Sequence, residues 1–282
     1  MKAIKIFSAC LIVIISAGLF FSTSSCKKTE DNNEYSYRAA MDNYTAERDF
    51  YRAYSQISKA AFQVNSKSTC DTIQGCPVLY ISGAFPERIL TIDFGTGCTY
   101  QDGTVFKGRI NTVMTGLYVD SAQTFTSTFE NFYQTVNGVD HQIQGTQVIT
   151  NMGHNNEGHP VYSVDVQGAS ITYNEGTIHW TSQRENEWVA GYDTYVNPWD
   201  DEYEVTGSAE GADINGAAFS VNITSPLLYK FCQSIFSWII ASGTIDIVNP
   251  GYPTITVDYG TGTCDLIVYV IINGTTYTLV LG

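Results

Sequence analysis

Basic residues are scarce in this chain of 282 residues, which has 14 Lys and Arg against 28 Asp and Glu. The formal net charge of −14 repels nucleic acid phosphates and no basic stripe is present, which argues against DNA or RNA as a partner. Long apolar runs are also missing after the first 25 residues. The longest, FSWIIASGTIDIV at 236–248, contains an aspartate and polar residues and suits a buried strand better than a membrane span.

Familiar catalytic and metal-binding motifs are also missing from the sequence. No glycine-rich phosphate loop precedes a helix, and no GxSxG nucleophile elbow occurs. The four histidines, at 141, 154, 159 and 179, match no common zinc spacing. Two of them lie with Glu157 in GHNNEGHP at 153–160, which is typical of a solvated hairpin tip. We therefore expect no metal, no cofactor and no enzymatic activity.

The N-terminus has the layout of a secretory signal, with two lysines before an apolar run that ends at Phe21. TSSC at 23–26 follows, which is typical of a bacterial lipobox cleaved before Cys26. We predict a signal peptide over 1–25 and a lipidated Cys26, whose several acyl chains, palmitate among them, would anchor the protein stably. An ordinary secreted protein with a spare cysteine is the alternative. Cleavage removes two lysines and no acids, which leaves 12 basic against 28 acidic residues and a net charge of −16.

Residues 26–34, CKKTEDNNE, are polar and charged and are typical of a short flexible tether. The acidic cluster behind the lipid cysteine resembles signals that direct lipoproteins to the cell surface. We predict an outer-membrane lipoprotein held through its lipid anchor. Whether it faces the periplasm or the cell exterior is left open by the sequence.

One stretch, residues 35–63, is strongly helical in pattern. Its apolar and aromatic residues recur at helical spacing along one face, interrupted at Arg48. This stripe consists of Tyr37, Met41, Tyr44, Tyr51, Tyr54, Ile57 and Ala61. We expect it to pack on the rest of the molecule, with a tyrosine-lined surface for a partner as the alternative.

The remainder, residues 64–282, is predicted to be all-β. Asn-Gly pairs at 137–138, 215–216 and 273–274 and the Asp-Gly pair at 102–103 stand between strand-forming segments, as in tight hairpins. A slightly longer turn is expected within ITYNEGTIHW at 171–180. Strands joined by such local turns form an antiparallel meander. A sandwich and a strongly bent half-barrel both fit, as do a single domain and two related lobes.

One phrase occurs twice, as TIDFGTGC at 91–98 and TVDYGTGTC at 256–264. In each copy an aspartate, Asp93 or Asp258, precedes a Gly-Thr-Gly at which the strand is expected to end in a sharp turn. The aspartates can accept hydrogen bonds from the amides of that turn. The turn glycines are Gly95, Gly97, Gly260 and Gly262. We interpret both phrases as architecture, away from the binding surface; the alternative pairs Asp93 with Asp258 as the two carboxylates of a glycan hydrolase.

These two phrases, together with FENFYQTVNG and EVTGSAEGADINGAAFSVNITSPLLYKFC, resemble a family of uncharacterised lipoproteins from Bacteroidota-type bacteria. The likeness covers most of the chain from about residue 70. It implies lipoprotein status and an all-β fold, and it implies no catalytic residues.

The cysteines after Cys26 are expected to form disulfides, since the compartment of an exported protein permits them. We favour Cys76–Cys98 and Cys232–Cys264, one bridge beside each copy of the phrase. Cys70 is then left over or competes with Cys76, and the connectivity stays open.

Two aromatic segments supply candidate ligand-binding residues. NPWDDEYE at 197–204 groups Trp199 and Tyr203 with carboxylates, as in sugar-binding sites, although a charged loop is the simpler interpretation. TIHWTSQRENEWVAGY at 177–192 places Trp180, Arg184 and Trp188 on one face, for ligand binding or for packing.

The sequence therefore predicts a lipid-anchored envelope lipoprotein with a binding or structural role, whose partner beyond the membrane is a glycan or an envelope protein. The alternatives are a hydrolase using Asp93 and Asp258, and a periplasmic carrier of an apolar ligand.

Overall fold

The computed structural model of the protein describes residues 32–65, 71–194 and 198–281. The signal peptide, Cys26, most of the tether and Cys70 lie outside these ranges, so the predictions about them stay predictions. One α-helix is followed by fourteen strands and one short 3₁₀ helix. In chain order these are α1 Asn32–Gln63, β1 Asp71–Ile73, β2 Val78–Ser82, β3 Arg88–Thr99, β4 Val105–Met114, β5 Thr124–Val136, β6 Val139–His154, β7 Pro160–Tyr173, β8 Gly176–Ala190, η1 Pro198–Asp200, β9 Glu202–Ala212, β10 Ala218–Cys232, β11 Ser237–Val248, β12 Ile255–Thr261, β13 Ile267–Ile272 and β14 Thr275–Val280.

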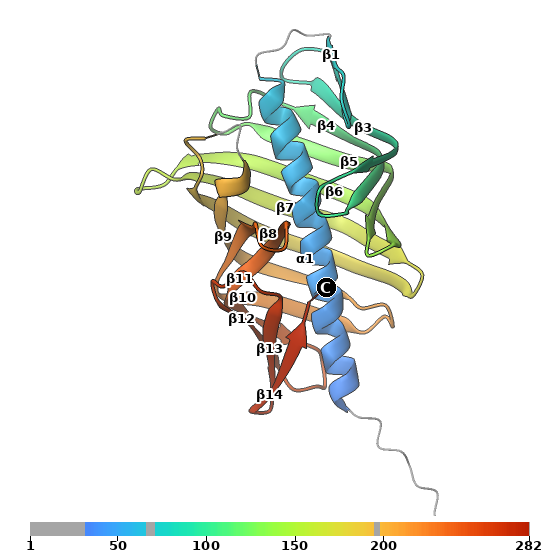
Figure 1. Cartoon of the computed structure of the whole chain (residues 1–282), viewed down its shortest axis with the longest axis vertical. Coiled ribbons are helices and arrows are strands. Elements are labelled where there is room, and N and C mark those ends of the chain that lie inside the picture. Colours follow the sequence, from blue (N-terminus) through green and yellow to red (C-terminus); the bar gives the residue numbers. More distant parts are fainter. Residues whose placement is uncertain (1–31, 66–70, 195–197, 282) are drawn as a thin grey trace, which may run out of the picture. The chain divides into compact units, whose positions relative to one another are not determined.

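All fourteen strands belong to one sheet whose order in space is their order in the chain, and each pair of neighbours is antiparallel (Figure 1). The predicted antiparallel meander with one N-terminal helix is confirmed, and the sheet is not closed into a barrel. The sandwich alternative is wrong, because there is one sheet and α1 packs on it where a sandwich would have a second. Strands β3, β8 and β12 all contact α1 although they are far apart in the sheet. The sheet therefore curves round the helix, as in the bent half-barrel alternative.

Two of the Asn-Gly pairs form the predicted two-residue hairpin turns. Asn137 and Gly138 have φ of 50° and 79°, and Asn273 and Gly274 have φ of 50° and 76°. Positive φ at both central residues defines the type I′ turn, whose twist matches that of the flanking strands. The sequence signal for these hairpins was therefore sufficient.

Two other turns differ from expectation. At 215–216 only the glycine has positive φ, because the loop is closed instead by Asp213, whose carbonyl accepts a hydrogen bond from the Gly216 N–H at 2.8 Å. The predicted longer turn within 171–180 is wrong, since Tyr173 pairs directly with Gly176 and only two residues separate β7 from β8.

The helix α1 is buried on its polar side as well as on its apolar side. The predicted stripe is buried at Tyr54, Ile57 and Ala61, but Tyr37 is 37% exposed. The polar residues of α1 that are nearly inaccessible to solvent are Asp42, Asn43, Glu47 and Asp49. A curved sheet encloses more of a helix than one face, which explains why a single amphipathic stripe does not describe this one.

Side chains from the sheet pair with these buried polar groups. The Arg184 guanidinium donates to the Glu47 carboxylate, and both side chains are more than nine-tenths buried. The Trp180 indole N–H donates to Asn43 Oδ1 at 3.2 Å. Buried charges are costly unless they are paired, so these contacts fix where α1 can sit on the sheet.

Asp49 forms a second polar anchor for α1. Its carboxylate contacts Arg48 at 3.0 Å and His141 Nδ1 of β6 at 2.6 Å. Burial acts to raise the pKa of Asp49, but the neighbouring Arg48 and His141 outweigh it and hold the pKa below its ordinary value. Gln134 Nε2 also donates to the Asp49 carbonyl at 2.7 Å.

The repeated phrase forms a β-bulge in both copies. The Gly95 N–H donates to Asp93 Oδ1 at 2.8 Å, and the Gly260 N–H donates to Asp258 Oδ1 at 2.8 Å, which confirms the predicted local role of both aspartates. The strand pairing is shifted at both places, twice where β3 pairs with β4 and once where β12 pairs with β11. The predicted strand end is wrong for the first copy, because β3 continues through Gly97 to Thr99. A bulge bends a strand without ending it.

Both favoured disulfides are present. Cys76 bonds to Cys98 and Cys232 bonds to Cys264, with Cα–Cα distances of 5.6 and 5.5 Å. One bridge joins the first copy of the phrase to the β1–β2 connection, and the other joins the second copy to the end of β10. Within the residues described, no helix is long and apolar enough to cross a membrane.

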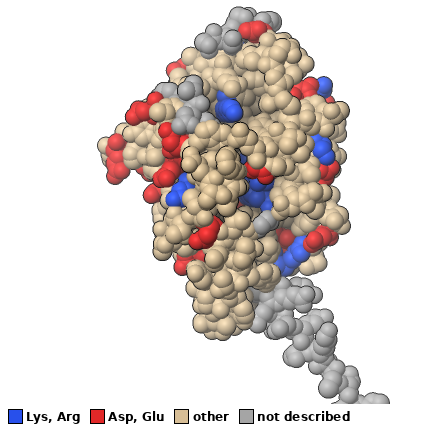
Figure 2. All heavy atoms as spheres, viewed as in Figure 1, with Lys and Arg blue, Asp and Glu red and all other residues tan. Residues whose placement is uncertain are grey.

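Charge is unevenly spread on the face of the molecule that carries α1. Figure 2 shows a largely uncharged surface there, with acidic side chains gathered at its left margin and only scattered basic ones. Figure 1 places the β6–β7 hairpin at that margin. This distribution agrees with the excess of acids in the sequence.

Candidate functional site

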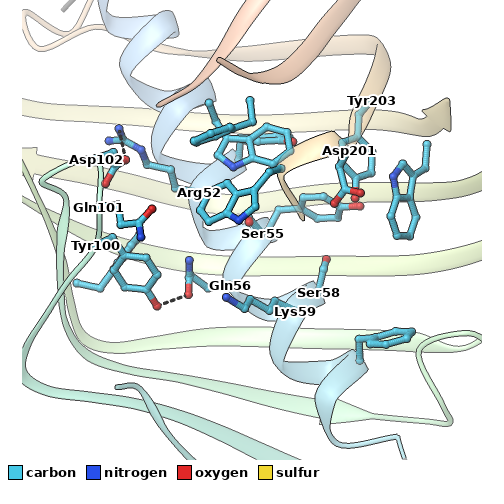
Figure 3. A pocket seen from close by; sticks show the side chains of 18 of the residues that line it. Arg52, Ser55, Gln56, Ser58, Lys59, Tyr100, Gln101, Asp102, Asp201 and Tyr203 are labelled. Carbon is cyan, nitrogen blue, oxygen red and sulfur yellow. Dashed lines mark hydrogen bonds and ion pairs between the residues drawn. The ribbon is translucent and has the colours of Figure 1, made fainter. Parts of the chain in front are cut away.

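A cavity of about 260 Å³ lies between the C-terminal half of α1 and four other parts of the chain (Figure 3). We call it the aromatic pocket, because twelve of its lining residues are Phe, Tyr or Trp. These parts are the β3–β4 hairpin, the β4–β5 connection with Tyr118, the β8–β9 connection and the β10–β11 hairpin. The lining aromatics are Tyr51, Tyr54, Phe62, Tyr100, Phe106, Tyr118, Trp188, Trp199, Tyr203, Phe231, Phe236 and Trp238.

The rings of the aromatic pocket are fixed by contacts with one another. Tyr51 stacks on Tyr229 with ring centroids 4.2 Å apart, and Trp188 stacks on Tyr203 at 5.5 Å. Such pairs contribute roughly 0.5–1.5 kcal/mol each beyond the area they bury. The inner wall is therefore rigid before any ligand arrives.

Two large aromatic side chains of the lining are open to solvent. Trp199 of η1 is 45% exposed, and Phe236 of the β10–β11 turn is 53% exposed. Phe231 lies against both, with ring centroids 4.4 Å from Trp199 and 6.1 Å from Phe236. These exposed rings form apolar surface that a ligand can cover.

Polar side chains line the opposite part of the aromatic pocket. The Tyr100 hydroxyl donates to Gln56 Oε1 at 2.6 Å, and Arg52 Nη2 lies 3.5 Å from the Asp102 carboxylate (Figure 3). Arg52 Nη1 is buried and donates no hydrogen bond to any described residue. Lys59 of α1 is exposed at the rim. The pocket therefore offers both ring faces and hydrogen-bonding groups.

One carboxyl group is buried among the rings. Asp201, directly after η1, is 8% exposed, and its Oδ1 atom accepts no hydrogen bond from the described part of the chain. Burial, and then the neighbouring Asp200 carboxyl, raise the pKa of Asp201 to about 7, against a smaller opposing effect of the Trp188 indole. A titratable group with a raised pKa inside a concave aromatic site is a common feature of functional sites.

The two disulfides hold hairpins that line the aromatic pocket. Cys98 stands two residues before Tyr100, at the base of the β3–β4 hairpin, and Cys232 directly follows Phe231, at the base of the β10–β11 hairpin. The repeated phrases, which we expected to lie away from the binding surface, are thus bridged to two hairpins that line the aromatic pocket. They remain architectural, but what they support includes two walls of the pocket.

Three of the five predicted ligand-binding residues line the aromatic pocket, namely Trp188, Trp199 and Tyr203. Trp180 and Arg184 do not, and this favours the packing alternative for them. Trp180 is 2% exposed and stacks on Phe50 of α1 at 5.5 Å, while Arg184 is paired with Glu47. The Arg184 guanidinium also lies 5.8 Å from the centroid of the Trp180 ring.

Asp93 and Asp258 are not brought together as neighbours in the sheet, since β3 and β12 are separated by eight other strands. Asp93 also accepts from Arg109 Nε at 2.9 Å. Burial acts to raise its pKa, but the hydrogen bonds from Arg109 and from the Gly95 N–H outweigh this and lower it. A carboxylate engaged in this way does not resemble a catalytic acid, which needs a raised pKa.

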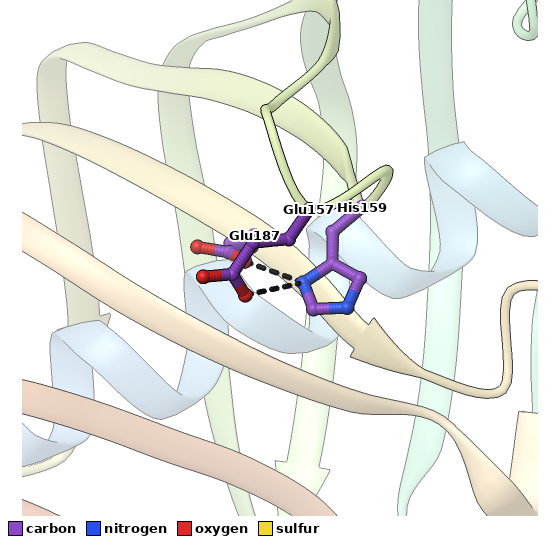
Figure 4. Close-up of side chains that lie close together, drawn as sticks. All are labelled: Glu157, His159 and Glu187. Carbon is purple, nitrogen blue, oxygen red and sulfur yellow. Dashed lines mark hydrogen bonds and ion pairs between the residues drawn. The ribbon is translucent and has the colours of Figure 1, made fainter.

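Another group combines His159 of the β6–β7 turn with Glu157 and Glu187 (Figure 4). His159 Nδ1 lies 2.6 Å from Glu187 Oε1 and 3.9 Å from Glu157 Oε2. Asn155 Nδ2 donates to the same Glu187 oxygen at 2.8 Å. Direct hydrogen bonding of the imidazole to Glu187 leaves no space for an ion between the two, so we interpret the group as an anchor for the hairpin.

Several residues of the aromatic pocket escaped the sequence-based prediction. Tyr51 and Tyr54 belonged to the predicted helical stripe, but not to the candidate ligand site. Phe231, Phe236 and Trp238 carried a usable signal, since they cluster around a turn in KFCQSIFSW at 230–238. Asp201 stood beside Trp199 in the sequence, but only the fold shows that it is buried.

Comparison of the chain with protein-family models, with curated proteins and with solved structures gave no match.

Proposed function

We propose that the protein is a lipid-anchored lipoprotein of the bacterial outer membrane that binds a glycan, with one sugar ring held in the aromatic pocket. The observation that carries this proposal is the combination of rigid aromatic faces with hydrogen-bonding side chains in one cavity. A cavity of this kind, mostly apolar with a few polar groups, is the usual form of a small-ligand site.

The chemistry of a sugar ring matches the two sides of the aromatic pocket. Its C–H faces are apolar and can lie against Trp199 and Trp238, and its hydroxyl groups both donate and accept hydrogen bonds. Arg52 and Gln56 lie on the polar side and can satisfy those hydroxyls. A purely apolar ligand would leave the buried Arg52 Nη1 without a partner, at a cost of roughly 1–3 kcal/mol.

The anchor is the second part of the proposal. A lipidated Cys26 and the tether 26–34 would hold the binding domain close to the membrane. Replacement of Cys26 by Ser should abolish incorporation of a labelled fatty acid and release the protein from the membrane fraction. Protease shaving of intact cells would distinguish the cell surface from the periplasm.

The alternative functions receive less support from the site. A hydrolase using Asp93 and Asp258 would require free carboxylates, whereas each of them accepts a hydrogen bond from a bulge amide. A carrier of an apolar ligand would need the enclosed face of the sheet, which α1 occupies. A non-enzymatic binding protein is therefore the function that we propose.

A glycan-array screen tests the proposal. Trp199 to Ala is the informative variant because this side chain is 45% exposed and its removal should not unfold the protein. Tyr269 to Ala is the matched control, an aromatic residue that is 40% exposed on β13, outside the lining of the pocket. We expect the wild type and the control to bind the same glycans and the Trp199 variant to lose them. Failure of the wild type to bind any glycan, or undiminished binding by the Trp199 variant, would contradict the proposal.

A further inference from the structure

The aromatic pocket contains two acidic side chains, and only one of them has a cation beside it. Asp102 pairs with Arg52 at 3.5 Å. Asp201 forms no ion pair with any Lys, Arg or His among residues 32–65, 71–194 and 198–281, and its Oδ1 atom has no hydrogen-bond donor there. Its charge, when present, is therefore not balanced by any cation within the described protein.

The groups that face Asp201 supply no positive charge. The Trp188 indole N–H acts on the carboxyl group as a hydrogen-bond donor, but it is neutral. The phenol groups of Tyr51, Tyr54 and Tyr203 are close enough for the Asp201 charge to raise their pKa values further, beyond the effect of burial. Asp200, the nearest acid, is exposed and its Oδ2 accepts from Thr194 Oγ1 at 2.8 Å. Of the pocket's cations, Arg52 is held by Asp102 and Lys59 lies at the exposed rim.

Aromatic rings around a buried carboxylate form a favourable site for an organic cation. Ring faces attract an ammonium group through their quadrupole, most strongly when the group is desolvated. A buried carboxylate without a partner is costly, and a bound cation removes that cost. The excess of acidic residues over the whole chain would also draw cations towards the protein.

We infer that the sugar ring bound in the aromatic pocket carries a free ammonium group, which pairs with the Asp201 carboxylate beside the rings of Trp188, Tyr203 and Tyr51. The ligand class is therefore an amino sugar that is not N-acetylated. The inference rests on the proposed function and adds to it the charge of the ligand and the residue that binds the charged group. Arg52 and Gln56, on the other side of the cavity, would then contact the ring hydroxyls.

Titration calorimetry at pH 7 with the full-length lipidated protein in detergent tests this inference. Glucosamine and N-acetylglucosamine are the probes, since they differ in whether the amine is charged, and benzyltrimethylammonium is a ring cation without sugar hydroxyls. Asp201→Asn removes the charge at nearly constant shape. Asp200→Asn removes the same charge one residue away, outside the lining of the pocket, and is the matched control.

We expect wild-type protein and the Asp200 variant to bind glucosamine at least about tenfold more tightly than N-acetylglucosamine. The Asp201 variant should lose this preference while its circular dichroism spectrum stays unchanged. Equal wild-type affinity for both sugars, or a preference that survives in the Asp201 variant, would overturn the inference and leave the glycan function standing. Binding of benzyltrimethylammonium alone would uphold the cation site and overturn the glycan function. Binding of none of the three would overturn both.

Discussion

The pairing of Glu47 with Arg184 gives a quantitative prediction about how α1 is held in the curved sheet. Both side chains are nearly inaccessible to solvent, and Tyr229 donates a further hydrogen bond to Glu47 Oε2 at 3.3 Å. The Nε and Nη1 atoms of Arg184 donate to no described residue, so Glu47 is its main partner. The perturbation that we consider is the replacement of each residue by Met, singly and together.

Removal of one member of a buried ion pair leaves the other buried without a partner, which lowers the free energy of unfolding by roughly 3–5 kcal/mol. Glu47→Met should reach this range, because the unpaired guanidinium of Arg184 cannot lose its charge. Arg184→Met should cost less, because the unpaired carboxyl group of Glu47 can take up a proton and still accept the hydrogen bond from Tyr229. The double variant leaves no buried charge, and we expect it within about 2 kcal/mol of the wild type.

Equilibrium urea unfolding with intact disulfides, followed by tryptophan fluorescence, measures the four free energies of this double-mutant cycle. We expect a coupling energy of at least about 2 kcal/mol between the two positions. Two results would refute the reasoning. One is a loss below about 1 kcal/mol for Glu47→Met, and the other is a double variant as unstable as the sum of the single ones.

Three further predictions follow from the same contacts. Asp201 has a pKa of about 7 in the folded protein against 3.8 ordinarily, so the folded state holds a proton that the unfolded chain lacks, and stability should fall as pH rises from about 4 to 7. The full pKa shift corresponds to about 4 kcal/mol of folding free energy, of which we expect about half because solvent reaches the pocket. Asp201→Asn should remove this pH dependence of stability, which urea unfolding at several pH values measures. A pH dependence that persists in the variant would contradict the prediction. Replacement of Cys232 and Cys264 by Ser opens a loop with a sequence separation of 32 and should lower the free energy of unfolding by about 3 kcal/mol. The same replacement should weaken glycan binding, because the bridge holds the β10–β11 hairpin. Unchanged glycan binding would show that the bridge does not support the pocket. Asp258→Ala should cost about 1 kcal/mol by removing the acceptor of the Gly260 N–H, and a loss of function without any loss of stability would instead favour a catalytic role.

Local signals predicted the meander well. The Asn-Gly turns at 137–138 and 273–274 depend only on the backbone freedom of two adjacent residues, and the aspartates of the repeated phrase bond to an amide two residues away. Such features are contained in a few consecutive residues and can be recognised in the sequence. The helix over 35–63 was recognised in the same way, with three further residues at its start.

Long-range features could not be predicted. Asn43 and Glu47 interact with Trp180 and Arg184, each 137 residues further along the chain, so no local pattern marks them as buried. The aromatic pocket draws its lining from five separate parts of the chain, and its shape depends on how far the sheet bends. Aromatic residues near carboxylates indicated Trp199 and Tyr203, but the same reasoning also selected Trp180, whose role is to pack on α1.

The most direct test of the account is a crystal structure of the protein grown with glucosamine. The account predicts the sugar ring in the aromatic pocket, covered by Trp199, with its amino nitrogen within hydrogen-bond distance of Asp201. A sugar bound at any other place, with the aromatic pocket unchanged, would contradict it.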